Sequence, residues 1–371
     1  MAAGSKKDGS STDLDSIRKR INDVDEQLQA LINERARFAQ QVGVAKGKLA
    51  SAVDYYRPER EAEVLRGIVD RNEGPLRDEE MLRLFREIMS ACLAQQEPLK
   101  IGFLGPEGTF TQTAVFKQFG HSVRALPFHT IDEIFQEVES GVADFGVVPI
   151  ENSTEGSVNN TLDMFLTSPL KIAGEIELRI EQHLLGKMTG LENIERICAH
   201  EQSLAQCRGW LREYLPHVEL IGMSSNAAGA RRARDEDGTA AIGPEVAADV
   251  YDLKIMVNSI EDRSDNSTRF LVVGRNLLAP SGSDKTTILV STSGTGGGAG
   301  VLHQLLQPLA DHNIVMTFIE SRPSRRKNWD YVFFIDIEGH ADESPVSDAL
   351  AVLEKESSLF RVLGAYPKAV G

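Results

Sequence analysis

The chain has 371 residues, 41% of them hydrophobic and 26% charged, which is a globular composition whose length predicts two to four domains. A formal net charge of −15 disfavours nucleic acid and anionic membranes as partners. No apolar stretch approaches the ~20 residues that a membrane-spanning helix needs.

The chain opens with MAAGSKKDGSSTD, which has lysines but no apolar segment of a secretory signal. We therefore expect residues 1–12 to be a disordered lead-in and the protein to be cytoplasmic. Three cysteines, Cys92, Cys198 and Cys207, are odd in number and widely spaced, which argues against a disulfide framework or a zinc site. They fit a reducing compartment, and we expect no metal or organic cofactor.

Residues 13–97 have the pattern of helices. No proline occurs from Asp13 to Lys48, and apolar residues recur at steps of three and four. Such a helix would be about 50 Å long, so its apolar stripe needs a partner chain or the shorter helices expected near 57–71 and 78–96. The stripe consists of Leu14, Ile17, Ile21, Val24, Leu28, Leu31, Phe38 and Val42.

The first helix also carries cations that can form a binding site. Arg35 and Lys46 share a face because they are about three turns apart, whereas Arg18 is roughly a quarter turn off that face. In an intertwined dimer Arg18 would reach the partner's pocket. Guanidinium, ammonium and amide groups suit a small dicarboxylate, although any single one of them can instead be a solvated surface charge. The shorter helices add Arg57, Arg60, Glu61, Cys92 and Gln96.

This segment resembles the all-helical chorismate mutases of the AroQ class, which form intertwined dimers. The resemblance lies in IRKRI (17–21), ERARFAQQVGVAK (34–46), RPERE (57–61) and FREIMSACLAQQ (85–96). It implies that Arg18 and Arg35 bind carboxylates of chorismate, that Lys46 and Gln96 donate to its ether oxygen, and that the remaining positions touch the ring hydroxyl side and a carboxylate. Those positions are Arg57, Glu61 and Cys92. Cys92 stands where relatives often carry Ser, and Arg57 where some carry Asp.

The implied rearrangement is pericyclic and needs no general acid, base or nucleophile. Negative charge grows on the ether oxygen as its C–O bond breaks, so donors already fixed there lower the barrier. Because residue 96 is Gln and not Glu, this donor predicts little loss of mutase activity between slightly acid and neutral pH.

After Glu97-Pro98, strand-like runs alternate with helical ones, which predicts α/β units with parallel strands. The stretch 99–275 is long enough for two lobes with a cleft between them. A Pro/Gly/Ser linker follows at 276–285. The expected strands include KIGFL (100–104), DFGVVPI (144–150), RICAH (196–200) and TAAIG (239–243).

Two segments join an apolar run to amide and hydroxyl side chains, FGVVPIENSTEGSV (145–158) and NSIEDRSDNSTRFLVV (258–273). A cleft that binds a small polar molecule needs such groups. With IGFLGPEGTFTQTA (101–114) and AHEQSLAQC (199–207), they resemble prephenate dehydratase along 99–275. The resemblance implies two α/β lobes, similar to periplasmic solute-binding proteins, with prephenate in the cleft.

The resemblance also implies that Thr268 is essential for loss of CO2 and water from prephenate, as the hydroxyl donor that helps hydroxide leave. We expect Asn152, Ser153, Gln206 and Arg269 to bind the substrate. Thr268 can alternatively be read as a strand residue on a half-buried face, and we interpret His200 as a strand-end histidine.

Residues 286–371 predict a β-α-β-β-α-β, ferredoxin-like domain. The glycines of GTGGGAG (294–300) mimic a dinucleotide fingerprint, but only one crossover follows. ESRP (320–323) and Gly300-Val301-Leu302 instead resemble a regulatory ACT domain. The resemblance implies phenylalanine bound between paired ACT domains, with sensitivity weakened by glycines where relatives carry Asn and Pro. The effector residues would be Gly300, Val301, Leu302, Glu320, Ser321 and Arg322.

Together the three segments resemble the bifunctional chorismate mutase/prephenate dehydratase family of phenylalanine biosynthesis. The resemblance implies chorismate and prephenate as substrates, feedback inhibition by phenylalanine, and a homodimer or higher homo-oligomer. Two alternatives remain open: a two-lobed solute-binding protein, and an active mutase whose remainder only senses phenylalanine.

Overall fold

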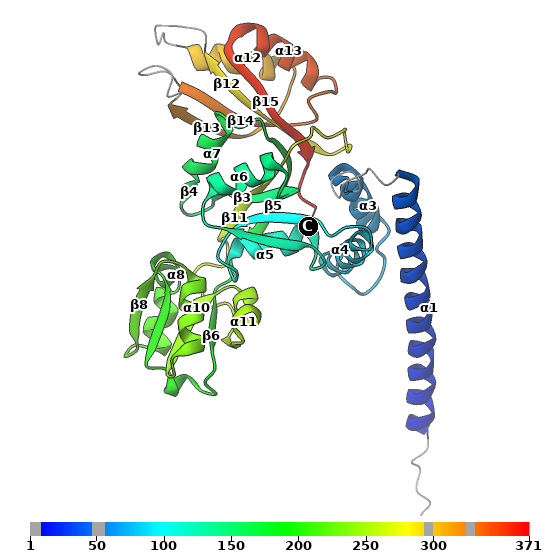
Figure 1. Ribbon diagram of the computed structural model, residues 1–371, viewed down its shortest axis with the longest axis vertical. Coiled ribbons are helices and arrows are strands. Elements are labelled where there is room, and N and C mark those ends of the chain that lie inside the picture. Colours follow the sequence, from blue (N-terminus) through cyan, green and yellow to red (C-terminus); the bar gives the residue numbers. More distant parts are fainter. Residues whose placement is uncertain (1–8, 47–55, 293–299, 324–330, 371) are drawn as a thin grey trace, which may run out of the picture.

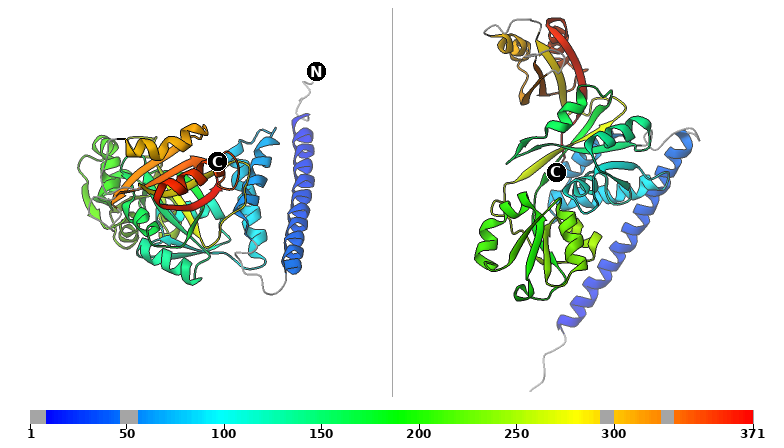
Figure 2. Two further views of the ribbon diagram at one scale, coloured as in Figure 1. Left: turned by 90° about the horizontal axis from the view of Figure 1, so that it is seen from above. Right: turned by 60° about the vertical axis from the view of Figure 1, so that its left-hand side comes forward.

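The computed structural model describes residues 9–46, 56–292, 300–323 and 331–370. The molecule is elongated, with a four-stranded sheet at one end, a small α/β lobe at the other and a larger lobe between them (Figure 1). A helical segment lies beside the larger lobe, and its first helix stands along the outside of the molecule (Figure 2). The multidomain prediction is confirmed.

The helical segment consists of α1 (Gly9–Lys46), α3 (Pro58–Asp70) and α4 (Asp78–Ala94). Pro58 sits at the start of α3, and Asp78 with two glutamates forms the acidic first turn of α4, which suits the helix dipole. The helix α1 begins at Gly9, within the stretch expected to be a disordered lead-in. It touches α4, but its apolar stripe from Leu14 to Leu31 is exposed in the single chain.

The larger lobe is built on a sheet of order β2-β1-β3-β11-β5, with the short β4 paired to β3. In this sheet β1 is parallel to both β2 and β3, as expected, whereas β11 is antiparallel to both β3 and β5. The chain leaves this lobe along β5 and returns along β11, so these strands depart from the expected all-parallel pattern. The strands are β1 (Lys100–Leu104), β2 (Arg124–Phe128), β3 (Phe145–Asn152), β4 (Gly156–Ser157), β5 (Lys171–Arg179) and β11 (Ser267–Gly274), and the helices α5 (Phe110–Phe119), α6 (Ile131–Ser140) and α7 (Asn159–Phe165).

The smaller lobe forms between β5 and β11 and has strand order β10-β6-β9-β7-β8. Its core contains Leu184, Ile197 and Ile242. The predicted strands 196–200 and 239–243 are β7 and β9. The strands are β6 (His183–Gly186), β7 (Arg196–His200), β8 (Glu219–Met223), β9 (Thr239–Gly243) and β10 (Lys254–Val257), and the helices η1 (Leu191–Asn193), α8 (Glu201–Gln206), α9 (Arg208–Tyr214), α10 (Asn226–Asp235) and α11 (Glu245–Tyr251).

The C-terminal part follows the predicted β-α-β-β-α-β order, with antiparallel strands in the order β13-β14-β12-β15. One face of this sheet packs on the larger lobe, because Leu289, Phe334 and Leu363 belong to the same buried cluster as Val148 and Leu271. The elements are β12 (Asp284–Thr292), α12 (Val301–Asp311), β13 (Met316–Pro323), β14 (Tyr331–Glu338), α13 (Val346–Glu356) and β15 (Ser357–Pro367).

The close approach of β15 to β5 requires a glycine. A Cβ atom on Gly364 would collide with the backbone oxygen of Ile172. We predict that Gly364→Ala lowers the free energy of unfolding by about 1–3 kcal/mol, because the two sheets must separate to admit the methyl group. Thermal unfolding of Gly364→Ala and the control Gly174→Ala checks this, since a Cβ on Gly174 makes only ordinary contacts of 3.6 Å with Val272. Equal stability of the two variants would contradict it.

Candidate functional sites

A pocket of about 370 Å³ lies between the three helices and the larger lobe. Five expected residues line it: Arg35 from α1, Arg57 and Glu61 at the start of α3, Cys92 from the end of α4, and Gln96, which follows α4. Helical periodicity brings them together as the sequence predicted.

Two further residues of the mutase prediction are not among the described residues that line this pocket. Arg18 is exposed on α1, 3.7 Å from Asp15, which agrees with its assignment to a second subunit's pocket. The side chain of Lys46 lies outside the described residues.

Arg60, which the sequence offered as a candidate cation without an assigned role, also lines the pocket, as do Tyr56 and Arg86, which were not predicted as site residues. Arg86 had a recognisable signal, because Arg86, Met89 and Leu93 lie on one face of α4 at steps of three and four. Tyr56 had none, because it precedes the helix.

Gln96 ties α4 to α1. Its Nε2 donates to the carbonyl of Ala39 at 2.6 Å, and a Cβ on Gly43 would already touch its side chain at 3.0 Å. Its buried Oε1 has no hydrogen-bond partner among the described residues. Because Nε2 carries two hydrogens and the contact with Ala39 uses one, the amide can offer both a donor and an acceptor to a ligand.

Glu61 is a titratable group in this pocket. Burial raises its pKa from 4.5 to about 7, and the nearby Arg86 and Arg35 partly offset that rise. Burial likewise lowers the pKa of Arg86, and Glu61 and Tyr56 act in the opposite direction. The pH expectation based on Gln96 alone is therefore incomplete, since Glu61 changes charge close to neutrality.

A second pocket, of about 340 Å³, lies between the two lobes. Thr268 and Asn152 line it from the larger lobe and Gln206 from the smaller one, so these three predicted residues converge. His200 also lines the cleft and, as the last residue of β7, accepts a hydrogen bond from the backbone of Gln202 at 3.3 Å.

The hydroxyl of Thr268 is oriented by its neighbours. Thr268 is only 9% exposed, and its Oγ1 accepts from Asn152 Nδ2 at 2.8 Å. Asn152 Nδ2 also contacts Asn266 Oδ1 at 3.1 Å. Because the oxygen of Thr268 already accepts from an amide, its own hydrogen can be donated to a ligand.

Amide and hydroxyl groups from the smaller lobe form a second network. Gln182 Nε2 donates to Ser203 Oγ and to Gln206 Oε1, each at 3.0 Å, and Asn226 Nδ2 donates to Ser203 Oγ at 2.8 Å. The buried Oε1 of Gln182 has no partner among the described residues. Gln182 and Asn226 had no local signal in the sequence, because each follows an unremarkable strand or turn.

Two predicted substrate contacts lie elsewhere. Ser153 does not line the cleft; its Oγ donates to Asn266 Oδ1 at 3.2 Å and accepts from the backbone of Ser267 at 3.0 Å. The expectation for Arg269 is corrected, since neighbouring strand residues face opposite sides of a sheet and Arg269 points away from Thr268. Its guanidinium contacts Glu175, Asp336 and Tyr366 at 2.9, 2.6 and 3.1 Å.

Two of the predicted effector residues, Glu320 and Arg322 on β13, lie where the C-terminal sheet meets the larger lobe. Glu320 on β13 accepts from Ser157 at 2.8 Å, and Arg322 contacts Asp163 and Asn159, each at 2.8 Å. Ser321 lies between them. Gly300 has a left-handed backbone at the start of α12, and Leu302 is exposed. The side chain of Val301 lies outside the described residues.

Across the described ranges, no helix combines the length and apolarity that crossing a membrane requires. In the same part of the chain, no group of three or more His, Cys, Asp or Glu side chains is arranged to hold a metal ion.

Family models match all three parts of the chain. A model of type II chorismate mutases matches residues 17–97, a prephenate dehydratase model matches 101–277, and an ACT domain model matches 297–355.

Relatives match over nearly the full length. The bifunctional chorismate mutase/prephenate dehydratase of Pseudomonas aeruginosa is 52% identical, over 96% of this chain and 98% of its own. That of Neisseria gonorrhoeae is 48% identical, over 95% and 96%. A solved prephenate dehydratase from Arthrobacter aurescens in complex with L-Phe is 36% identical, with a TM-score of 0.66 over 72% of this chain and 90% of its own.

The raised pKa of Glu61 predicts a pH-dependent stability. A carboxyl that holds its proton more tightly when folded destabilises the fold as pH rises from 4.5 through about 7, by at most about 3 kcal/mol. Glu61→Gln is therefore expected to be more stable than wild type at pH 8, with a difference that shrinks toward pH 5. Calorimetric unfolding across this range measures it, with exposed Glu73→Gln as the control. A pH-independent difference would contradict the prediction.

Proposed function

The chain belongs to the bifunctional chorismate mutase/prephenate dehydratase family, and we propose that its helical pocket rearranges chorismate to prephenate while its cleft converts prephenate to phenylpyruvate. The observation that carries this division is the contrast between the two pockets. The helical pocket gathers Arg35, Arg57, Arg60 and Arg86, whereas the described residues that line the cleft include no Lys, Arg, Asp or Glu.

In the mutase pocket, chorismate binds through its two carboxylates. Arg35 holds one of them, and Arg18 of a second subunit holds the other, since bidentate guanidinium–carboxylate pairs fix orientation as well as charge. Gln96 and Lys46 donate to the ether oxygen, where negative charge grows in the transition state. Glu61 accepts from the ring hydroxyl.

In the cleft, Thr268 donates its hydrogen to the ring hydroxyl of prephenate as the C–O bond breaks. The electrons of the C–C bond to the departing CO2 form the aromatic ring, and hydroxide leaves as water with the proton from Thr268. A proton from solvent then returns Thr268 to its hydroxyl form. Asn152 holds the Thr268 oxygen, and Gln206 with its partner Gln182 contacts the substrate from the smaller lobe.

Phenylalanine inhibits the dehydratase through the C-terminal sheet. The effector residues of β13 touch β4 and α7 of the larger lobe, through Glu320 to Ser157 and Arg322 to Asp163. An effector that displaces these side chains therefore changes how the C-terminal sheet sits on the lobe that carries Thr268.

The chain works as a homodimer or higher homo-oligomer. The uncovered stripe on α1 is longer than isolated surface hydrophobics require, and a second α1 packed against it would bring Arg18 to the neighbouring pocket. The three unpaired, buried cysteines fit a cytoplasmic location.

Replacing Thr268 tests the dehydratase assignment. Thr268→Val keeps the shape but removes the donor, so kcat for phenylpyruvate formation from prephenate should fall by about 100-fold or more, and Thr268→Ser should retain much of it. Thr286→Val is the control, because Thr286 loses a comparable buried hydrogen bond, 2.7 Å to the carbonyl of Gly339, and neither residue lines the cleft. Unchanged turnover in Thr268→Val would contradict the assignment.

Interrupting the α1 stripe tests the dimer. Leu28→Glu should dissociate the dimer and lower mutase activity at least tenfold, while dehydratase activity with supplied prephenate persists. Ala30→Glu adds the same charge on the opposite face of α1 and should do neither. Sedimentation measures assembly, and a monomeric Leu28→Glu with full mutase activity would contradict the shared pocket.

One assay separates the alternatives. Chorismate is supplied, prephenate and phenylpyruvate are followed, and phenylalanine is then added. We expect both products, with less phenylpyruvate after the addition. Prephenate without phenylpyruvate would favour the sensor, and neither product would favour the binding protein.

A further inference from the structure

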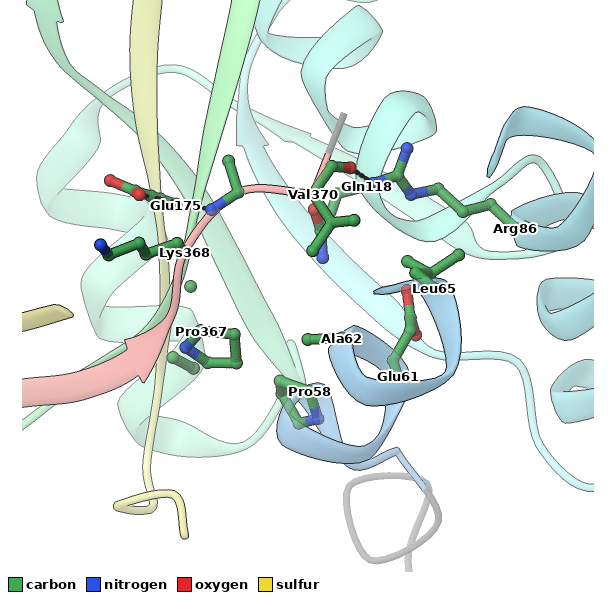
Figure 3. Close-up of a pocket in the computed structure, with 13 residues that line it drawn as sticks. Pro58, Glu61, Ala62, Leu65, Arg86, Gln118, Glu175, Pro367, Lys368 and Val370 are labelled. Atoms are coloured by element: carbon green, nitrogen blue, oxygen red, sulfur yellow. Dashed lines mark hydrogen bonds between the residues drawn. The ribbon is translucent and has the colours of Figure 1, made fainter. Parts of the chain in front are cut away.

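The C-terminal tail, residues 367–370, leaves β15 and crosses to the helical segment. The amide of Lys368 donates to the carbonyl of Ser283 at 3.0 Å, and that of Ala369 to Glu175 Oε1 at 3.3 Å. The side chain of Val370 packs against the core that Leu65, Ile68 and Leu82 form between α3 and α4. The end of the regulatory part of the chain thus lies against the helices of the mutase (Figure 3).

Arg86 receives this tail. Its Nη2 donates to the backbone oxygen of Val370, and the two groups meet beside a cavity of about 30 Å³ that Glu61, Ala62 and Leu65 also line. Figure 3 shows the Arg86 guanidinium directed to the tail, with Glu61 on the neighbouring helix. The tail therefore holds the guanidinium group of Arg86 in place.

The same Arg86 forms part of the wall of the mutase pocket. It is only 9% exposed, and its buried Nε has no hydrogen-bond partner among the described residues. Glu61 also borders both the small cavity and the mutase pocket. Since a buried charge without a fixed partner is costly, the position of Arg86 depends on the carbonyl that holds it.

From this arrangement we propose that the C-terminal tail seats Arg86, which acts as a positioning residue that favours the carboxylate form of Glu61 in the chorismate pocket. Arg86 is the largest favourable charge acting on the pKa of Glu61, ahead of Arg35. Among the described residues, the other charged and titratable groups around this part of the pocket are Tyr56, Arg57, Glu59, Arg60 and Cys92, and those around Arg86 and the small cavity are Lys117, Glu175 and Lys368. The inference rests on the proposed mutase reaction in the helical pocket.

Glu175 connects the tail to the rest of the chain. Its Oε2 accepts from Arg269 Nε at 2.9 Å and Lys285 Nζ at 2.8 Å, while its Oε1 accepts from Ala369. The buried carboxylate of Glu175 thus joins β11, through the residue that follows Thr268, to β12 of the C-terminal sheet and to the tail. The tail's position is therefore set by how that sheet sits on the larger lobe.

The experiment compares the full chain with a chain that ends at Lys368, and with a control that lacks only Gly371. The control keeps a Val370 oxygen for Arg86. We expect the shorter chain to raise KM for chorismate about fivefold or more, with smaller change in kcat, and to keep kcat/KM for supplied prephenate within about twofold. The control should behave as wild type.

Two Arg86 variants sharpen the test. Arg86→Ala should give a similar rise in KM for chorismate. Truncation of the Arg86→Ala variant should then add little to that rise, and Arg86→Lys should keep part of the affinity for chorismate. In the shorter chain and in Arg86→Ala, the pH profile of kcat/KM for chorismate should move to higher pH, because the pKa of Glu61 rises when Arg86 is displaced or removed.

The failures are distinguishable. Unchanged chorismate KM in the shorter chain, or a parallel loss of mutase and dehydratase activity, would overturn the role of the tail. Additive effects of truncation and Arg86→Ala would overturn the link between them. A full chain that cannot rearrange chorismate at all would instead overturn the proposed function.

Discussion

Strand β11 is the element on which both the catalytic cleft and the domain arrangement depend. Thr268 faces the cleft from one side of the strand, and Arg269 enters a buried charge cluster on the other. Burial alone would lower the pKa of Arg269, but Tyr366, Asp336 and Glu175 raise it above its ordinary value, so the guanidinium stays charged. Buried carboxylates without that cation would be strongly destabilising. The placement of Thr268 is therefore coupled to contacts made by the C-terminal sheet.

The cluster explains why the C-terminal domain is fixed to the larger lobe in one orientation. An apolar interface alone would allow the two sheets to slide past each other. The contacts of Arg269 with Asp336 on β14 and Tyr366 on β15 form in only one relative position of the sheets. Lys285 from β12 binds the same Glu175 at 2.8 Å. Three strands of the C-terminal sheet thus contact Arg269 or its partner Glu175. A shift of this sheet would therefore displace the residue next to Thr268, which is the physical basis for an effector acting on the cleft.

The sequence predicted the elements and the residues whose spacing follows one helix or one strand. Arg35 and Glu61 lie on helices that the sequence pattern predicted, whereas the roles expected of them and of Gln96 came from the resemblance to known mutases. The β-α-β-β-α-β order followed from alternating runs. Arg269 was misplaced because a motif read as a block ignores the alternation of side chains along a strand. The antiparallel β11, and the meeting of Arg86 with Val370, depend on where a distant segment of the chain returns, which no local pattern contains.

The difference in charge between the two pockets fits the different fates of a carboxylate in the two reactions. The rearrangement keeps both carboxylates, so cations such as Arg35 can bind them in the ground state and the transition state alike. Dehydration instead discharges the ring carboxylate as CO2. A guanidinium paired with that group would stabilise prephenate more than the transition state and so slow the reaction. In the proposed reaction, the amides and hydroxyls around Thr268 bind prephenate by hydrogen bonds, and no Lys or Arg among the described lining residues pairs with the departing carboxylate. One pocket could not satisfy both requirements, which is a physical reason for the chain to carry two.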